Sequence, residues 1–248
     1  MDKLLYVAMS GAKETMRAQA ANTHNLANAS TTGFKADLSA FQSRAVTGPG
    51  YASRVYATDT TVGFDHGAGA IEQTGNPLDL AIHGNGFFAV QDPTGNEAYT
   101  RAGDLHVDPT GQLLTATGLP VMGDNGPISI PPHSSVAVGA DGTISIVPLG
   151  QTPNTISTVA RVKLVNPPLD SIQRSNDGLF RATNGQPLEA DASVTVDSGS
   201  LESSNVNLAS CMVNMIELSR HFDLQVKAIH TAEEDGQASA KLLQSSGG

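Results

Sequence analysis

Glycine and proline are distributed very unevenly along this 248-residue chain, and this distribution constrains its fold more than any other feature. Residues 1–32 contain one glycine, Gly11, and residues 203–235 contain neither residue type, so almost all of the 25 glycines and 13 prolines lie between them. Glycine and proline interrupt helices and mark turns. We therefore expect an α+β fold, with a helix at each end and an all-β domain in the middle.

The N-terminal segment, from Asp2 to about Asn28, carries a narrow apolar stripe at helical spacing. The stripe recurs every three or four residues and consists of Leu4, Leu5, Ala8, Ala12, Met16, Ala20, Thr23 and Ala27. This period predicts an amphipathic helix. Because most of these side chains are small, they bury little area, and we expect the helix to be marginal on its own.

The C-terminal segment shows a stronger repeat. Apolar residues recur every seven positions, at Leu208, Met215, Phe222 and Ile229, and Gly236 and Leu243 continue the register. The intervening positions are filled by Cys211 or Met212, Leu218, Val226 and Ala232. A heptad repeat held over this length predicts a coiled-coil-like helix that pairs with the N-terminal one. Ser203, Ser204 or Asn205 would cap its beginning.

Short alternating runs separated by turn sequences fill the middle of the chain. The expected strands are 78–82, 87–90, 105–107, 128–130, 136–138, 143–147, 159–165 and 194–196. Asp-Pro-Thr-Gly at 92–95 and 108–111 is a hairpin turn composition. The spacing predicts a sandwich or barrel-like domain. We expect four parts: an N-terminal helix and turn (1–43), an extended connector (44–73), a β-rich domain (74–200) and a C-terminal helix (201–248).

The net charge is −10, from 14 Lys and Arg against 24 Asp and Glu. Nucleic-acid binding needs clustered Lys and Arg to neutralise phosphates, so this charge argues against a nucleic-acid partner. No apolar run approaches the roughly 18 residues of a membrane span. The early apolar run at 4–9 is too short for the core of a signal peptide, so we expect no cleaved leader.

The residues that carry chemistry form no recognised catalytic or metal site. A single cysteine, Cys211, excludes an intrachain disulfide and a multi-cysteine zinc site. The seven histidines include no pair with the spacing of a helical zinc hydrolase. Asp104 and Asp108 are candidate acid and base of a secreted β-domain hydrolase, but their surroundings also read as ordinary turns. A carbohydrate-binding module is disfavoured because there is no Trp for an aromatic platform. We predict no enzyme activity and no cofactor.

The two terminal stripes are the remaining feature, since neither can be covered within its own segment. A helix pair that still exposes apolar surface binds a partner, and joining such surfaces head to tail gives a ring or an open filament. The first helix would contribute Leu4, Leu5, Ala8, Ala12, Met16, Asn25, Leu26 and Asn28 to this assembly interface. The last helix would contribute Leu208, Met212, Met215, Leu218, Phe222, Val226 and Ile229.

Several long motifs, in order along nearly the whole chain, resemble the bacterial flagellar rod and hook proteins. The N-terminal signature of that family, close to Asn-Asn-Leu-Ala-Asn-x-x-Thr-x-Gly-Phe-Lys, is matched by residues 25–28 and by Thr32, Gly33, Phe34 and Lys35, while His24 replaces its first Asn. The central motif is matched at 74–82, including Gly75, Asn76, Pro77, Leu78 and Asp79. The C-terminal signature is matched at 201–207, including Asn205 and Asn207.

Within this family, residues 1–11 and the chain length are most similar to the proximal rod proteins of the F type, with distal rod and hook proteins as near alternatives. The resemblance implies a structural subunit that polymerises with copies of itself and with other rod proteins into a periplasmic drive shaft that transmits torque. It also implies export by the type III apparatus without a cleaved signal. The terminal helices would form an inner tube, and their folding would be coupled to assembly.

Overall fold

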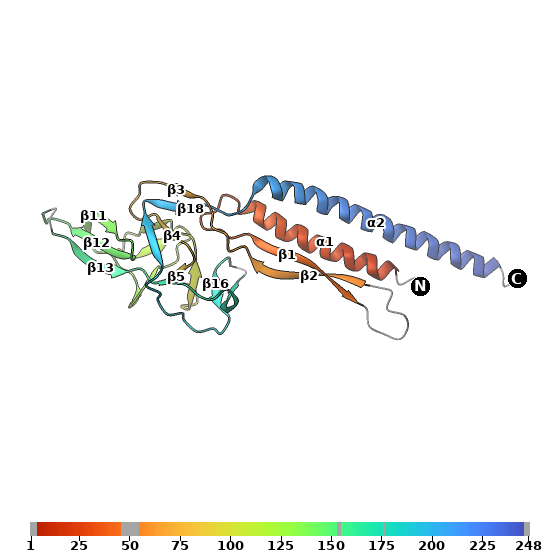
Figure 1. The fold of residues 1–248 in the computed structure, drawn as a ribbon, viewed down its shortest axis with the longest axis horizontal. Coiled ribbons are helices and arrows are strands. Elements are labelled where there is room, and N and C mark those ends of the chain that lie inside the picture. The colour runs from red at the N-terminus through yellow and green to blue at the C-terminus, as the bar shows by residue number, and fades with distance from the viewer. Residues whose placement is uncertain (1–3, 46–54, 153–154, 176, 246–248) are drawn as a thin grey trace. The chain divides into compact units, whose positions relative to one another are not determined.

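The computed structural model describes residues 4–45, 55–152, 155–175 and 177–245. These residues form two compact units, and each is described by itself (Figure 1). The helical unit comprises Met1–Ala29, Asp37–Phe64 and Val206–Gly248. The β unit comprises Ser30–Ala36 and Asp65–Asn205. Helices at both ends and strands in the middle confirm the predicted α+β class.

In the helical unit, α1 (Leu4–Ala27) and α2 (Leu208–Ser245) pack side by side in antiparallel orientation (Figure 1). Thr15 Oγ1 donates to Gln225 Oε1 at 3.2 Å, and Asn22 Nδ2 donates to the Cys211 carbonyl at 2.8 Å. At about 1.5 Å per residue, α1 is roughly 36 Å long and α2 roughly 57 Å. The last turns of α2 therefore extend past the beginning of α1.

A β-hairpin completes the helical unit. β1 (Asp37–Ala45) pairs antiparallel with β2 (Val55–Phe64), and both strands contact α1. The extended connector predicted over 44–73 did not include this pairing. Because the sequence of β1 mixes small and polar residues, it lacks the strict alternation that marks a half-buried strand. The hairpin gives α1 a packing partner besides α2.

Short antiparallel strands build the β unit. Their order along the chain is β3 (Ile71–Gln73), β4 (Leu80–His83), β5 (Phe87–Gln91), β6 (Glu97–Thr100), β7 (Leu105–Val107), β8 (Leu113–Thr115), β9 (Met122–Gly123), β10 (Gly126–Pro127), β11 (His133–Val138), β12 (Thr143–Pro148), β13 (Ser157–Arg161), β14 (Leu164–Val165), β15 (Ile172–Arg174), β16 (Phe180–Ala182), β17 (Thr195–Ser198) and β18 (Ser200–Glu202), with a 3-10 turn, η1 (Leu169–Ser171), before β15.

The described strands form several small sheets instead of the two large faces of a sandwich. The largest has the order β14-β5-β6-β16-β15, the next is β11-β12-β13, and the others are two-stranded. Turns with glycine at positive φ, such as Gly95 and Gly111, cut the strands short. The strand expected at 128–130 is not formed, because Ser129 makes only an isolated bridge to Gln112, although Ile128 and Ile130 are buried.

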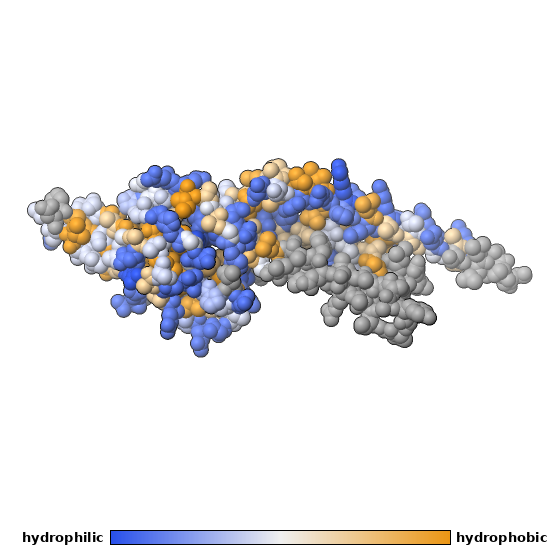
Figure 2. All heavy atoms as spheres, in the orientation of Figure 1, coloured by the Kyte–Doolittle hydropathy of each residue, from blue (hydrophilic) through white to orange (hydrophobic). Residues whose placement is uncertain are grey.

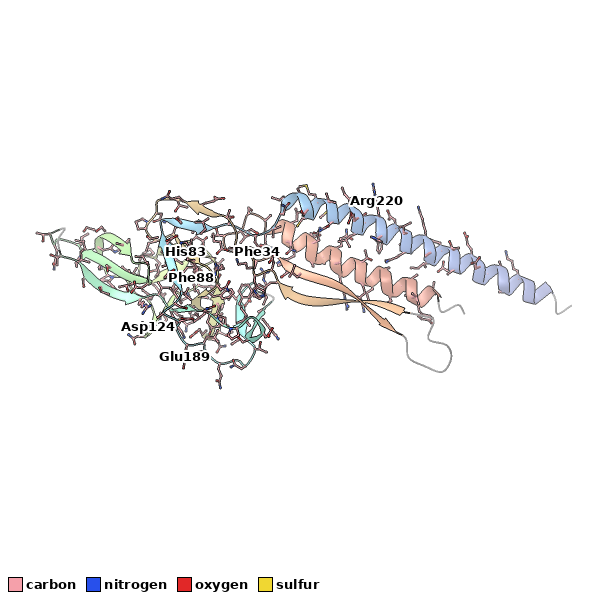
Figure 3. The ribbon with its side chains drawn as sticks, viewed as in Figure 1. Phe34, His83, Phe88, Asp124, Glu189 and Arg220 are labelled. Carbon is pink, nitrogen blue, oxygen red and sulfur yellow. The ribbon has the colours of Figure 1, made fainter. Side chains whose placement is uncertain are left out.

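Beside a smaller cluster of Val90, Ala98 and Leu179, a large apolar core packs these sheets together. Its buried members are Leu80, Ile82, Phe88, Leu105, Leu113, Val121, Ile128, Ile130, Ile144, Ile146, Val162, Leu164, Val194 and Val196. Phe88, on β5, lies among the side chains of the β unit and is fully buried (Figure 3). Strands too short to be stable alone are thus held by a shared core.

Candidate assembly surface

The structure divides the predicted interface residues of α1 and α2 by their exposure. Half-buried side chains are Leu5, Ala8, Ala12, Leu26, Asn28, Met215, Leu218, Phe222, Val226 and Ile229. Met16, Leu208 and Met212 are exposed, and Asn25 is buried. The side chain of Leu4 lies outside the described residues. The half-buried side chains of α1 are covered by α2 or by the hairpin that also packs on α1, whereas the exposed group is available to other molecules.

The predicted heptad residues of α2 face α1, except for the first one, Leu208, which is exposed. Cys211 and Ala232 are buried, and Met215, Phe222 and Ile229 between them are half-buried. Leu208 is 49% exposed and Met212 53%. Of the two residues considered for the intervening position, Cys211 therefore faces α1 and Met212 faces outward.

Large apolar side chains remain uncovered on both helices. The side chains that are about half exposed or more are Tyr6, Met9 and Met16 on α1 and Leu208, Met212, Val213, Ile216 and Leu224 on α2. Figure 2 shows apolar residues gathered over the first turns of α2. Arg220 projects from the side of α2 that is turned away from α1 (Figure 3). Exposed apolar surface of this kind marks a place where another molecule packs.

An apolar groove of about 530 Å³ runs between the two helices. It is lined by Met9, Ala12, Lys13, Met16, Arg17, Ala20, Phe222, Val226 and Ile229. Lys13 and Arg17 place positive charge at its border, and Arg17 Nη1 lies 3.1 Å from Glu14 Oε2. The groove thus combines an apolar floor with a basic edge.

Asparagines fasten the ends of the helices. Asn25 Nδ2 donates to the Asp37 carbonyl at 2.9 Å, and the Asp37 amide donates to Asn25 Oδ1 at 2.8 Å. Asn28 Nδ2 donates to the His24 carbonyl at 2.9 Å, which satisfies a backbone group at the end of α1. His24 Nδ1 and Asp37 Oδ2 are 2.7 Å apart. These contacts tie the end of α1 to the beginning of the hairpin.

The cap of α2 is Asn207, not Ser203, Ser204 or Asn205 as predicted. Asn207 Oδ1 accepts a hydrogen bond from the Ser210 amide at 3.0 Å, and the Asn207 carbonyl accepts one from the Cys211 amide at 3.0 Å. Asparagine is among the best N-cap residues for this purpose. The three predicted residues do not cap α2, because the helix begins further along the chain, at Leu208.

In the β unit, the Gly33-Phe34-Lys35 motif forms one tightly packed turn. Gly33 has φ +67, and a Cβ there would lie 2.3 Å from the Arg101 carbonyl carbon, so only glycine fits. Phe34 is buried, with the Arg174 guanidinium 4.2 Å from its ring centroid. Arg174 Nη1 also donates to the Lys35 carbonyl at 2.8 Å. The motif is therefore a packing site within the β unit.

Lys35, Arg101 and Glu202 form a buried charge cluster. Lys35 Nζ lies 2.7 Å from Glu202 Oε1, and Arg101 Nε donates to Glu202 Oε2. Burial raises the pKa of Glu202, but the hydrogen bonds from Lys35 and Arg101 outweigh it and hold that pKa below its usual value. Burial lowers the pKa of Lys35, and the Glu202 carboxylate opposes this only in part. No sequence pattern signals the cluster, because its members are far apart in the chain.

Asn205 joins the segments through which the chain enters and leaves the β unit. Its Oδ1 accepts from the Ala36 amide at 2.8 Å, and its Nδ2 donates to the carbonyls of Asp65 and Gly67 at 3.1 and 3.0 Å. Lys35 Nζ adds a hydrogen bond to the Gly67 carbonyl at 2.9 Å. Residues 30–36, 65–69 and 202–205 are thus fastened to one another, and we call this arrangement the junction.

The central motif also has a structural role. The Asp79 carboxylate accepts from Thr74 Oγ1 at 2.6 Å and from Asn76 Nδ2 at 2.8 Å. Gly75 has φ +77, and the Pro77 carbonyl accepts from Ser198 Oγ at 2.8 Å. Leu78 packs against the core. These contacts close the turn that leads into β4.

The two candidate catalytic carboxylates, Asp104 and Asp108, lie in different surroundings, and their pKa values shift in opposite directions. A hydrogen bond from Thr110 lowers the pKa of Asp108, whose Oδ1 also accepts from the Gln112 amide at 2.7 Å within its own turn. Burial, followed by the nearby Asp79 carboxylate, raises the pKa of Asp104.

Among the described residues, no group of three or more His, Cys, Asp or Glu is placed to hold a metal ion. In the same residues, no helix has the length and apolar character to cross a membrane.

Family models match three parts of the chain. A model described as flagella basal body rod protein matches residues 5–35. One described as flagellar hook protein FlgE/F/G D1 domain matches 81–146. One described as flagellar basal body rod FlgEFG protein C-terminal matches 197–244. The first and last of these ranges contain most of α1, most of α2 and the ends of the junction.

Whole-length relatives agree with these matches. The chain is 43% identical over 252 residues to the flagellar basal-body rod protein FlgF of Salmonella typhimurium strain LT2, covering 99% of this chain and 100% of the relative. FlgF of Escherichia coli K12 is 42% identical with the same coverage. FlgG of Buchnera aphidicola subsp. Schizaphis graminum is 32% identical, covering 89% of this chain and 92% of the relative.

Proposed function

The chain belongs to the flagellar basal-body rod protein family, of the F type, and from this premise we propose that it polymerises into the rod through α1 and α2. The family membership makes it a structural subunit of the proximal rod. The observation that carries the proposed mode of assembly is the set of large apolar side chains left uncovered on the two helices.

The partners of these helices are copies of the chain and other rod proteins. Half-exposed Leu208, Met212 and Ile216 would be covered by neighbouring helices in the assembled rod. Burial of apolar surface supplies the driving force, at about 25 cal/mol per Å² removed from water. We place the subunit in the periplasmic part of the basal body, reached through the type III export apparatus without a cleaved signal, and we assign it no enzymatic activity.

The β unit has a different task in this proposal. A shaft that carries torque must resist deformation, and close-packed interiors have low compressibility. The junction fastens three chain segments with the buried Glu202 cluster and Asn205. We propose that it keeps the β unit rigid at the places where the chain continues into the helical unit.

The test replaces outward apolar residues of α2 by aspartate. Met212→Asp with Ile216→Asp should leave the free chain folded, because both side chains are already exposed, yet abolish swimming and incorporation into basal bodies. The matched control is Leu149→Asp in the β unit, whose side chain is 69% exposed. We expect the control to swim normally. A doubly substituted chain that is incorporated at wild-type level would contradict assembly through this surface.

A further inference from the structure

We propose that the groove between α1 and α2 receives residues 233–245 of α2 from a second copy of this chain. The inference rests on the proposed function and deepens it, because it names the segment and the surface that meet. Four observations on the helical unit lead to it: the length of α2, a glycine with free space around it, the charges on the two surfaces and the shape of the groove.

The last turns of α2 have no partner in the described part of α1. A Cβ at Gly11 would lie 2.9 Å from Gln225 Nε2, so these two residues are at the same level of the antiparallel pair. Counting seven residues outward from each places Leu4, the first described residue of α1, opposite Ala232. Ala232 is also the last buried side chain among those described on α2. Residues 233–245 therefore extend about 20 Å further, and we call them the overhang (Figure 1).

Gly236 stands at the heptad position that follows Ile229, inside a continuous helix. A Cβ at this residue would meet no described heavy atom within 4 Å, so nothing in the described part of the chain requires a glycine here. Glycine destabilises a helix interior relative to alanine. Ala240, one turn further on, is also small and lies on the same side of the helix. Small residues at this spacing let another helix approach closely.

The charges of the two surfaces are complementary. Glu233, Glu234 and Asp235 are exposed at the beginning of the overhang, with Glu233 Oε2 3.9 Å from His230 Nδ1. Lys13 and Arg17 line the groove. Within one chain, Lys13 is level with about residue 223, so the acidic run lies roughly 15 Å further along α2. Within one chain the acidic run is therefore too far from Lys13 and Arg17 to pair with them, and Arg17 pairs with Glu14 instead. Between copies, the acidic run would come close to both basic residues.

The groove presents the large side chains that such a helix would pack against. Met9, Met16 and Phe222 line it together with Val226 and Ile229. Small residues on one helix facing large residues on another give interdigitated packing. A copy displaced along the helix axis would lay its overhang in this groove, parallel to α2 and antiparallel to α1. This contact joins two different surfaces, so it repeats from copy to copy in an open chain.

Cysteine pairs test this arrangement in the full-length chain. Met16→Cys lies in the groove and Gly236→Cys lies on the overhang. Within one chain their Cα atoms are about 24 Å apart along the helices, far beyond the roughly 7 Å that a disulfide allows. Cys211 is kept because it is buried, and the wild-type chain serves as the blank.

The double variant, Met16→Cys with Gly236→Cys, is oxidised in isolated basal bodies and examined by denaturing electrophoresis and mass spectrometry. We expect a ladder of covalent oligomers of this chain. The control pair is Leu224→Cys with Gly236→Cys, because Leu224 is two residues from Phe222 and points about 200° around the helix from it. The control pair should give no ladder.

The outcomes separate this inference from the function on which it rests. Incorporation into basal bodies without the 16–236 disulfide would overturn the contact and leave the proposed function standing. A disulfide to a different rod protein, or a product that stops at two copies, would also overturn it. Failure of the wild-type chain to enter the rod would instead contradict the proposed function itself.

Gly236→Leu gives a second measurement that does not depend on oxidation. The free space around Gly236 means that leucine should fold at least as well as the wild type, with unchanged or higher helix content. In the rod, its side chain would clash with the groove of the next copy, and we expect loss of swimming. Gly236→Ala, the matched control, should swim. Normal swimming of Gly236→Leu would overturn the inference.

Discussion

The β unit and the helical unit satisfy their apolar residues to very different degrees. In the β unit, fully buried side chains such as Phe88, Leu113 and Ile144 form a continuous core. Among the described side chains of α1 and α2, the buried apolar ones are Ala18, Cys211 and Ala232, all of them small. The large apolar residues of the helices are half-buried or exposed. One chain thus carries a part whose packing is complete and a part whose packing needs neighbours.

This difference separates stability from assembly within one molecule. The core side chains and buried charges of the β unit have partners within it, so we expect this unit to hold its fold without help from another chain. We propose that the helical unit uses its exposed apolar surface for contacts that form in the rod. The expectation that the helices fold only when neighbours cover them stays a prediction. Paired substitutions in the two units would test this difference.

The largest expected effect comes from truncating the same residue type in each unit. Phe88→Ala should destabilise the β unit by about 3–5 kcal/mol, since it leaves a cavity in a core that excludes water. Phe222→Ala should cost the free chain clearly less, because Phe222 is only half-buried. Urea denaturation followed by circular dichroism measures both. Equal losses at the two positions would show that the units are packed alike.

A charge removed from the junction should have an effect nearly as large. Glu202→Ala leaves the buried Lys35 and Arg101 without their carboxylate, which costs about 3–5 kcal/mol of stability. Glu217→Ala, at an exposed position on α2, should stay within about 0.5 kcal/mol of wild type. Thermal unfolding of both variants makes the comparison. A stable Glu202→Ala chain would mean that the cluster does not hold the junction.

Acid should weaken the β unit to a smaller extent. Hydrogen bonds from Thr94 and Arg181 lower the pKa of Asp92, and the pKa of Glu202 is also lowered. A carboxyl with a lowered folded-state pKa stabilises the fold above its unfolded pKa, and this contribution is lost as the pH falls through the folded value. The free energy of unfolding should therefore decrease as the pH falls below about 4, near the ordinary pKa values of aspartate and glutamate. Arg181→Gln should reduce this dependence.

The smallest effect is expected at the outward face of α2. Leu224→Ala removes a side chain that is 61% exposed, so the stability of the free chain should change by no more than about 0.5 kcal/mol. Leu80→Ala, at a buried position of β4, is its matched partner and should cost about 2–5 kcal/mol. Differential scanning calorimetry of the two variants would measure the ratio. A large loss at Leu224 would mean that this face is already covered in the free chain.

The elements with strong local signals were predicted well from the sequence. The helix expected from Asp2 to about Asn28 is α1, and the strand expected at 105–107 is β7. A 3.6-residue period and a turn sequence can both be recognised from residues that are close together in the chain. Asn28 bonds the His24 carbonyl at the end of α1, whereas Asn25 bonds the backbone of Asp37 at the beginning of β1.

The features that were missed depend on residues distant in the sequence. Lys35, Arg101 and Glu202 lie in three separate segments, and no periodic pattern links them before the chain has folded. The hairpin of β1 and β2 was missed for the same reason. Its two strands have weak sequence patterns, and they pack on α1, which is a separate element of the chain. The predicted assembly interface and the four-part division of the chain remain predictions.

Gln225 gives the helix pair a fixed alignment. It occupies a heptad position between Phe222 and Ile229, where it faces Gly11 and accepts a hydrogen bond from Thr15. Sliding one helix along the other by a heptad would bring this amide opposite Leu4 or Ala18, away from both partners, and would also break the hydrogen bond from Asn22 to the Cys211 carbonyl. Polar residues in an apolar seam penalise such slippage. The length by which α2 protrudes is therefore the same in every molecule. The helix pair acts as a ruler, and a polymer built from it inherits a constant axial spacing.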